Sequence, residues 1–104
     1  MNGNELISFQ IISDVGTARS MYVEAIQEAK KGNIQAAKQL IEDGVKVFVD
    51  GHHAHASLIQ KEAAGEKSEF SLLLMHAEDQ LMTTETLKIV AEEFIELYSD
   101  KYHQ

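Results

Sequence analysis

Histidine offers the widest chemistry in this chain, and five are present: His52, His53, His55, His76 and His103. A neutral imidazole carries a lone pair that attacks phosphorus or binds a metal ion near pH 7. His52 and His55 are three residues apart. Asp79 and Gln80 follow His76 by three and four residues, so all three share a face if this segment is helical. His103 stands beside the last residue, where we expect fraying.

The spacing leaves three interpretations open. In the first, His76 accepts a phosphoryl group, with the amide of Gln80 or the histidines at 52 and 55 as polar neighbours. In the second, the histidines at 52, 55 and 76 bind a metal ion together with the carboxylate of Glu78 or Asp79, although His-x-x-His spacing is a weak signal. In the third, each histidine is a structural residue with one hydrogen-bond partner at the edge of the core.

The composition excludes several classes of function. The 104 residues include no Cys, so there is no disulfide, thiolate zinc site, iron–sulfur cluster or cysteine nucleophile. The net charge is −8, with eight Lys and one Arg (Arg19), and an acidic chain without a basic cluster is a poor ligand for nucleic acid. No apolar run reaches the ~18 residues of a membrane span, and the first residues lack the basic start of a signal peptide. We therefore expect a cytoplasmic protein that neither inserts into membranes nor binds nucleic acid.

Two glycine-containing breaks divide a chain that has no proline, the residue that long helices exclude. Lys31-Gly32-Asn33 is typical of a helix end followed by an N-cap. Gly65 marks a second end, with Ser68 as the next cap and Glu69 in the first turn. These breaks predict helices at about 4–31, 34–64 and 68–100. The fold class is all-α: one domain over 1–104, an antiparallel three-helix bundle with short turns.

Apolar residues recur at steps of three and four in each predicted helix, as the buried face of a bundle requires. The expected core stripes are Ile11, Val15, Ala18, Tyr22, Ala25 and Ala29; Ile34, Ala37, Ile41, Val45, Phe48, His52, His55 and Ile59; and Leu73, Ala77, Leu81, Thr84, Ala91, Ile95 and Tyr98. Gly44 and Gly51 interrupt the second helix. They either allow another group to approach closely near His52 or are tolerated at the surface.

The third helix carries a second stripe that a three-helix bundle does not need for its core. Its members are Leu72, Met75 or His76, Asp79, Met82 or Thr83, Thr86, Ile89 and Val90. A second apolar face is typical of association between copies, with this helix beside a symmetry axis. Asp79 then lies in an apolar seam, where like charges require a cation or a raised pKa. The alternative is a solvated carboxylate at the edge of the stripe.

The run Met75–Thr84 resembles the signature of the lactose/cellobiose-type IIA proteins of the phosphoenolpyruvate-dependent sugar phosphotransferase system. That signature reads His-(Gly/Ala)-Gln-Asp-His-Leu-Met-Thr, and the chain reads His-Ala-Glu-Asp-Gln-Leu-Met-Thr from His76. Further similarity covers nearly the whole chain, at the segments 16–20 (Gly-Thr-Ala-Arg-Ser), 31–33, 63–66 and 95–98.

The resemblance implies a cytoplasmic phosphocarrier that forms a homotrimer of three-helix subunits. His76 corresponds to the histidine that takes a phosphoryl group from phospho-HPr and passes it to a cysteine of the cognate IIB protein. The sugar is then phosphorylated during uptake through the IIC membrane component. Asp79 corresponds to the aspartate that binds a divalent cation at the trimer axis, for which we expect Mg²⁺.

Two positions depart from the family pattern. Gln80 stands where the family has a second histidine, and His55 stands where the second helix commonly has glutamine. If the two positions face each other, the pair of side chains has been exchanged in place. We expect His52, His55, Gln80 and Thr83 to support the phosphoryl group on His76. The alternative function is a non-catalytic metal-binding or regulatory helical-bundle trimer.

Overall fold

The computed structural model describes residues 3–67 and 71–102. These residues form three helices and no strand: α1 (Gly3–Lys30), α2 (Ile34–Ala63) and α3 (Leu72–Tyr102). The all-α prediction is confirmed, and α1 and α2 end within a residue of their predicted limits. The predicted cap at Ser68 and Glu69 lies outside the described residues. Helix α3 is capped instead by Ser71, whose Oγ accepts a hydrogen bond from the Leu74 N–H at 3.0 Å.

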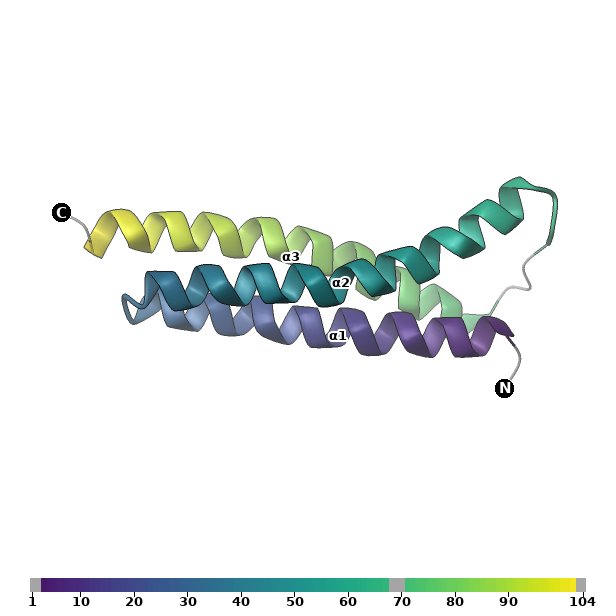
Figure 1. Cartoon of the computed structure of the whole chain (residues 1–104), viewed down its shortest axis with the longest axis horizontal. Coiled ribbons are helices and arrows are strands. Elements are labelled where there is room, and N and C mark those ends of the chain that lie inside the picture. Colours follow the sequence, from purple (N-terminus) through teal and green to yellow (C-terminus); the bar gives the residue numbers. More distant parts are fainter. Residues whose placement is uncertain (1–2, 68–70, 103–104) are drawn as a thin grey trace.

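The helices form an elongated bundle of 56 × 23 × 20 Å. Each helix runs antiparallel to the next one along the chain, so α1 and α3 run in the same direction (Figure 1). The start of α3 therefore lies at the same end of the bundle as the start of α1. The end of α3 lies beside the α1–α2 turn, where the Tyr102 hydroxyl donates to the Lys30 carbonyl at 2.8 Å.

Both predicted glycine turns adopt the left-handed conformation that favours this residue. Gly32 has φ +87° and Gly65 has φ +90°. The Asn33 N–H donates to the Glu28 carbonyl at 3.0 Å, which closes the end of α1. Asn33 is the N-cap residue of α2, as predicted, but its side chain makes no capping hydrogen bond and its Nδ2 donates to Glu28 Oε2 at 2.8 Å instead. The Asn33 side chain thus binds a residue in the last turn of α1 and makes no hydrogen bond to the first turn of α2.

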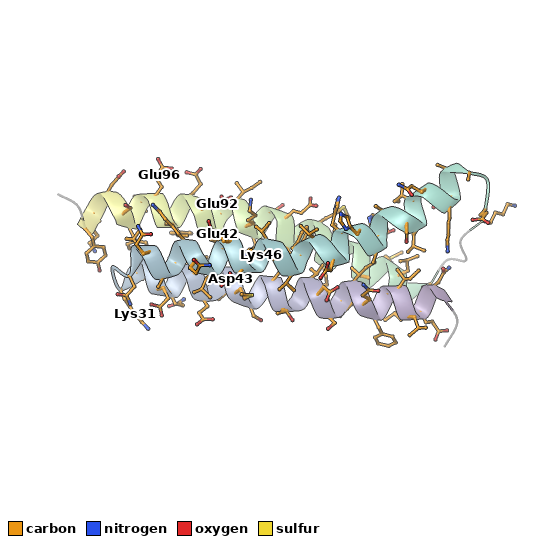
Figure 2. All side chains as sticks on the ribbon, viewed as in Figure 1. Lys31, Glu42, Asp43, Lys46, Glu92 and Glu96 are labelled. Carbon is orange, nitrogen blue, oxygen red and sulfur yellow. The ribbon has the colours of Figure 1, made fainter. Side chains whose placement is uncertain are left out.

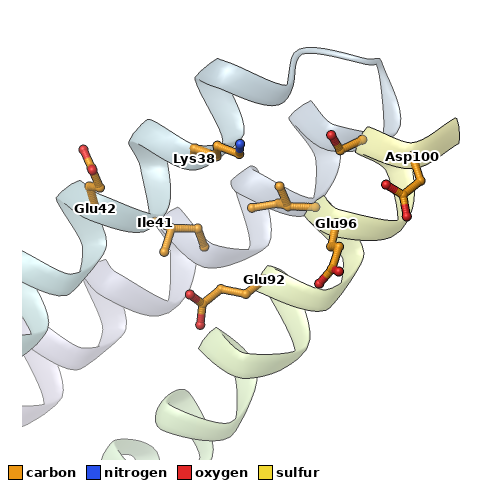
Figure 3. A pocket seen from close by; sticks show the side chains of 8 residues that line it. Lys38, Ile41, Glu42, Glu92, Glu96 and Asp100 are labelled. Carbon is orange, nitrogen blue, oxygen red and sulfur yellow. The ribbon is translucent and has the colours of Figure 1, made fainter. Parts of the chain in front are cut away.

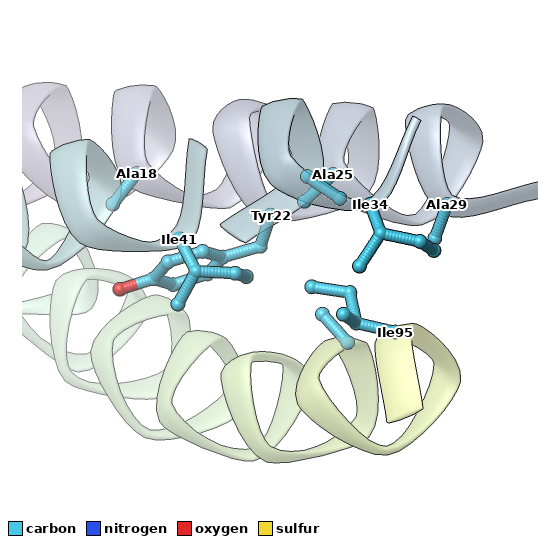
Figure 4. Close-up of a cluster of buried hydrophobic side chains, with 9 residues drawn as sticks. Ala18, Tyr22, Ala25, Ala29, Ile34, Ile41 and Ile95 are labelled. Atoms are coloured by element: carbon cyan, nitrogen blue, oxygen red, sulfur yellow. The ribbon is translucent and has the colours of Figure 1, made fainter. Parts of the chain in front are cut away.

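The predicted core stripe of α1 is fully buried. Five alanines of the bundle core let the helices approach closely around Tyr22, which is 1% exposed (Figure 4). The buried residues of this cluster are Ala18, Tyr22, Ala25, Ala29, Ile34, Ala37, Ile41, Ala91 and Ile95. A second cluster, made of Ile11, Val15, Ala77 and Leu81, packs the start of α3 against α1. This second cluster fixes the turn of α3 that carries His76.

The predicted stripe of α2 is wrong in its second half. His52 and Ile59 are exposed, and the buried positions are Gly44, Gly51 and Leu58. Glycine has no side chain, so a search for apolar side chains misses it. A Cβ built on Gly44 would lie 2.6 Å from the Tyr22 ring, and one on Gly51 would lie 3.2 Å from Val15 Cγ2. Both glycines therefore allow α1 to approach α2 closely.

We expect Gly44→Ala to destabilise the fold by about 1–3 kcal/mol, because the new methyl group overlaps the ring of Tyr22 in a filled core. Gly16→Ala is the matched control. A Cβ at Gly16 meets nothing within 4 Å, so the higher helix propensity of alanine adds up to ~1 kcal/mol. Urea unfolding of the two variants measures both effects, and equal stabilities would contradict the packing described.

Burial, and secondarily the charge of Glu92, raises the pKa of Tyr22 to about 12 from 10.0. A raised pKa means that the folded state holds this proton more tightly than the unfolded state. The resulting stability is complete below pH 10 and is lost as the pH rises towards 12. We expect Tyr22→Phe to reduce the alkaline loss of stability by about 2–3 kcal/mol. Urea unfolding across this pH range tests it, and identical pH slopes would contradict it.

The last third of α2 bends away from α1 (Figure 1). Gly51 comes shortly before this third of α2 in the sequence, and within it the Ser57 hydroxyl donates to the Ala54 carbonyl at 2.7 Å. Glycine and back-bonding serine are two of the features that bend helices. Residues 59–67 are exposed as a result. The divergent segment includes His55, beside α3.

Candidate functional site

His76 is the fifth residue of α3 and is exposed. Ala77, the next residue, is fully buried against α1, so the backbone that carries His76 is held rigidly. At about 100° per residue, Gln80 and Thr83 lie on the same flank of α3 as His76. The predicted grouping of His76 with Gln80 is therefore confirmed. The Thr83 hydroxyl donates to the Asp79 carbonyl at 2.8 Å, which leaves its oxygen lone pairs as acceptors.

The second stripe of α3 is exposed in a single chain. Its apolar members point away from α1 and α2: Leu72 (76% exposed), Met75 (48%), Met82 (58%), Ile89 (61%) and Val90 (41%). Asp79 is exposed among them. A row of large apolar side chains at helical spacing is typical of a surface that another helix covers. Asp79 thus lies within this stripe rather than beside it.

His55 is joined to Glu78 across the two helices. Its Nε2 lies 3.2 Å from Glu78 Oε1, and the side chains are 20% and 39% exposed. Glu78 and Gln80 are two residues apart, which places them about 200° apart around α3. The hypothesis that His55 faces Gln80 is therefore wrong within one chain, because His55 takes Glu78 as its partner.

The site residues thus fall into three rows along the start of α3. His76, Gln80 and Thr83 form one flank, the exposed stripe with Asp79 lies in the middle, and Glu78 with His55 forms the other flank. His52 is apart from these rows, exposed on α2 and stacked on Phe48 with ring centroids 6.4 Å apart. A single chain does not bring the histidines at 52, 55 and 76 together.

The described residues contain no group of three or more His, Cys, Asp or Glu side chains that could hold a metal ion. The metal interpretation of the histidines within one chain therefore has no support in residues 3–67 and 71–102.

A separate groove of about 420 Å³ lies between α2 and α3 near the end of α3. Its floor is formed by Ile41 and Ile95, and carboxylates dominate its walls: Glu42, Glu92, Glu96 and Asp100 (Figure 3). Glu42, Glu92 and Glu96 lie towards the α1–α2 turn, far from the start of α3 (Figure 2). Such a groove repels phosphoryl groups, so it does not belong to the His76 site.

Comparison with known proteins agrees with this arrangement. Residues 6–99 match the model of the family described as the lactose/cellobiose-specific IIA subunit of the sugar phosphotransferase system. The chain belongs to this family, and it is a phosphotransferase-system component. No described helix is long and apolar enough to cross a membrane.

Individual relatives span nearly the whole chain. The lichenan-specific enzyme IIA component of Bacillus subtilis (strain 168) is 46% identical over 90% of this chain and 86% of its own length. The oligo-beta-mannoside-specific EIIA component of the same strain is 41% identical over 94% and 89%. A crystal structure of the cellobiose-specific enzyme IIA from Bacillus anthracis superposes with a TM-score of 0.93 at 44% identity, covering 96% of this chain and 92% of that one.

Glu78 is the residue of this region whose partner the sequence did not reveal. Spacing along one helix shows which residues share a face, but not which residue of another helix meets them. The pairing with His55 depends on how α2 is rotated against α3. The sequence does contain two residue types that can form such a pair, a carboxylate at Glu78 and an imidazole at His55.

Proposed function

We propose that the chain is a phosphocarrier that accepts a phosphoryl group from phospho-HPr on His76 and passes it to a cysteine of the cognate IIB protein. The observation that supports this most directly is the exposure of His76 on a rigidly packed turn of α3. Two different proteins must reach the same imidazole in turn, and an exposed flank permits that.

The transfer exchanges one bond for another at phosphorus. The lone pair of a His76 ring nitrogen attacks the phosphorus atom, and the bond between phosphorus and the donor atom of HPr breaks with its electron pair returning to HPr. In the second step the thiolate of IIB attacks, and His76 leaves with its electron pair restored. Such transfers depend chiefly on positioning and charge stabilisation, which fits a small rigid helical surface.

Supporting groups surround His76 in this proposal. Gln80 lies on the same flank, where its amide can donate to a phosphoryl oxygen. Thr83 lies about one turn further along α3. Its hydroxyl oxygen can accept a hydrogen bond from water or from the partner protein. Within one chain His52 and His55 lie apart from this flank, so their imidazoles can support the phosphoryl group only if assembly brings α2 of another copy to His76. A phosphoryl group adds about −1.5 to −2 charges, so polar donors on an exposed surface are the suitable environment.

The carrier is a homotrimer in our proposal, with the exposed stripe of α3 at the axis. Three copies bring three Asp79 carboxylates together, which a single chain does not do. Mg²⁺ prefers oxygen ligands in octahedral geometry, and three carboxylates with water molecules complete such a set. Because bound metal stabilises the folded state, EDTA is expected to lower the melting temperature of the wild type but not of Asp79→Ala.

The sugar belongs to the lactose/cellobiose class, taken up through a IIC membrane component, and the carrier works in the cytoplasm. Support comes from the names of the relatives, which specify lichenan, oligo-beta-mannosides and lactose.

Incubation with phosphoenolpyruvate, enzyme I and HPr tests the proposal by intact mass. We expect one acid-labile phosphoryl group per chain, which a IIB protein then removes. A chain that gains no mass is not a phosphocarrier, and the alternative of a non-catalytic metal-binding or regulatory trimer takes its place. Omission of HPr is the control for direct transfer from enzyme I.

A further inference from the structure

A second cavity continues the acidic groove towards the middle of the bundle. Its volume is about 300 Å³, and like the groove of about 420 Å³ it lies between α2 and α3. The residues that line the two cavities lie between Lys38 and Phe48 on α2 and between Glu85 and Asp100 on α3. We call the two cavities together the α2–α3 furrow. Its α3 side is about 22 Å long at about 1.5 Å per residue, which is the length of three to four helical turns.

The floor of the furrow is apolar. Ile41 and Ile95 lie at one end with 8% and 5% exposure (Figure 3), and Val45 and Phe48 line the other end. A long apolar floor between two helices suits the apolar face of a further helix, which completes a four-helix arrangement there.

Tyr22 of α1 places a hydroxyl group in the furrow. The residue is 1% exposed, and its ring lies between α2 and α3 (Figure 4). No hydrogen bond joins this hydroxyl to another residue of 3–67 or 71–102. Glu92 of the first cavity is close enough for its charge to raise the pKa of Tyr22, so the two cavities meet around the hydroxyl. A nearly buried hydroxyl without a partner costs free energy, which a hydrogen bond to an occupant recovers.

The walls of the furrow carry an excess of negative charge. Five carboxylates line it, against two lysines. Lys88 is already paired with Glu92 at 3.4 Å, whereas no ion pair joins Glu96 or Asp100 to another residue that the structure describes. Charge complementarity therefore favours a basic occupant. A second copy of this chain is a poor match, because each copy has a net charge of −8.

We propose that the α2–α3 furrow binds a basic amphipathic helix of another protein. The apolar face of that helix packs on Ile41, Ile95 and Phe48, and its Lys or Arg side chains pair with the carboxylates of the walls. One cationic N–H donates to the Tyr22 hydroxyl oxygen beside Glu92. Binding is non-covalent and independent of His76, which lies outside the furrow near the start of α3.

A labelled 15-residue synthetic peptide, with leucines at helical spacing and lysines on both flanks, is the probe for fluorescence anisotropy. We expect saturable one-to-one binding to the wild type, and at least about tenfold weaker binding to Glu96→Lys/Asp100→Lys. The matched control is Glu24→Lys/Glu62→Lys, which changes the net charge equally at exposed positions outside the furrow and keeps the wild-type affinity. Tyr22→Phe leaves the net charge unchanged, and we expect about three- to tenfold weaker binding.

Each contrary outcome has a defined meaning. Equal weakening by the two double variants shows attraction to overall charge only and overturns the proposal. Equal binding of a peptide with glutamate in place of lysine, or no saturable binding to the wild type, also overturns it. Met82→Lys alters the exposed stripe outside the furrow. Binding to this variant but not to the wild type shows that another copy covers the furrow, which again overturns the proposal. His76→Ala is expected to bind the peptide as the wild type does, so failure of the phosphocarrier function would leave this proposal intact.

Discussion

Replacing His76 by alanine is expected to abolish phosphorylation by phospho-HPr, a loss of more than about a thousandfold in the labelling rate. In the proposed function the imidazole of His76 is the nucleophile, and alanine offers no lone pair to phosphorus. The fold is expected to survive, because His76 is exposed and its neighbour Ala77 provides the buried contact. Intact mass after incubation with phosphoenolpyruvate, enzyme I and HPr measures the loss.

The control for this variant is His53→Ala. His53 is exposed on α2 and contacts only the ring of His52 among the described contacts, with centroids 6.3 Å apart. We expect it to be labelled at the wild-type rate. A phosphoryl group that persists in His76→Ala would place the acceptor at another histidine and overturn the assignment.

Ile89→Lys is expected to convert the assembly into single chains. Ile89 lies on the exposed stripe at 61% exposure, so in one chain the lysine is solvated and the fold is unaffected. In an assembly around the stripe, each copy brings a positive charge into an apolar seam, and the like charges oppose one another. We expect the dissociation constant to rise at least about a thousandfold. Sedimentation velocity measures the mass, and for the wild type we expect three times the mass of one chain.

Leu6→Lys provides the comparison. Leu6 is 57% exposed on α1, away from the stripe, so the same charge is added to an equally exposed position. A wild-type mass for Leu6→Lys and a single-chain mass for Ile89→Lys identify α3 as the contact. An unchanged mass for Ile89→Lys would show that the stripe is not the interface.

The helices and turns were largely predictable from local chemistry. Gly32 and Gly65 mark turns because both require positive φ, and the α1 stripe follows a strict helical period. The second half of α2 was not predictable in the same way. There the buried positions include Gly44 and Gly51, whereas His52 and Ile59 are exposed. Apolar periodicity identifies side chains that fill a core, but not positions where the absence of a side chain permits close packing.

The candidate site was predictable along α3 and not between helices. His76, Asp79 and Gln80 lie on one segment, so their relative directions follow from the helical period alone. The partner of His55 does not, because Glu78 and Gln80 are equally plausible until the rotation of α2 against α3 is known. The structure selects Glu78. The sequence therefore predicts which residues share a face of α3, but not which residues of α2 they meet.

The parallel course of α1 and α3 gives the molecule two unlike ends (Figure 1). His76 shares one end with Gly3, while Tyr102 lies about 39 Å further along α3, at about 1.5 Å per residue. Copies related by a rotation axis all point the same way, so their acceptor histidines gather at a single pole. A sensor surface or fluorescent fusion joined beyond Tyr102 would leave that pole open to HPr. The same attachment before Gly3 would crowd it, which makes the choice of terminus decisive for any binding assay.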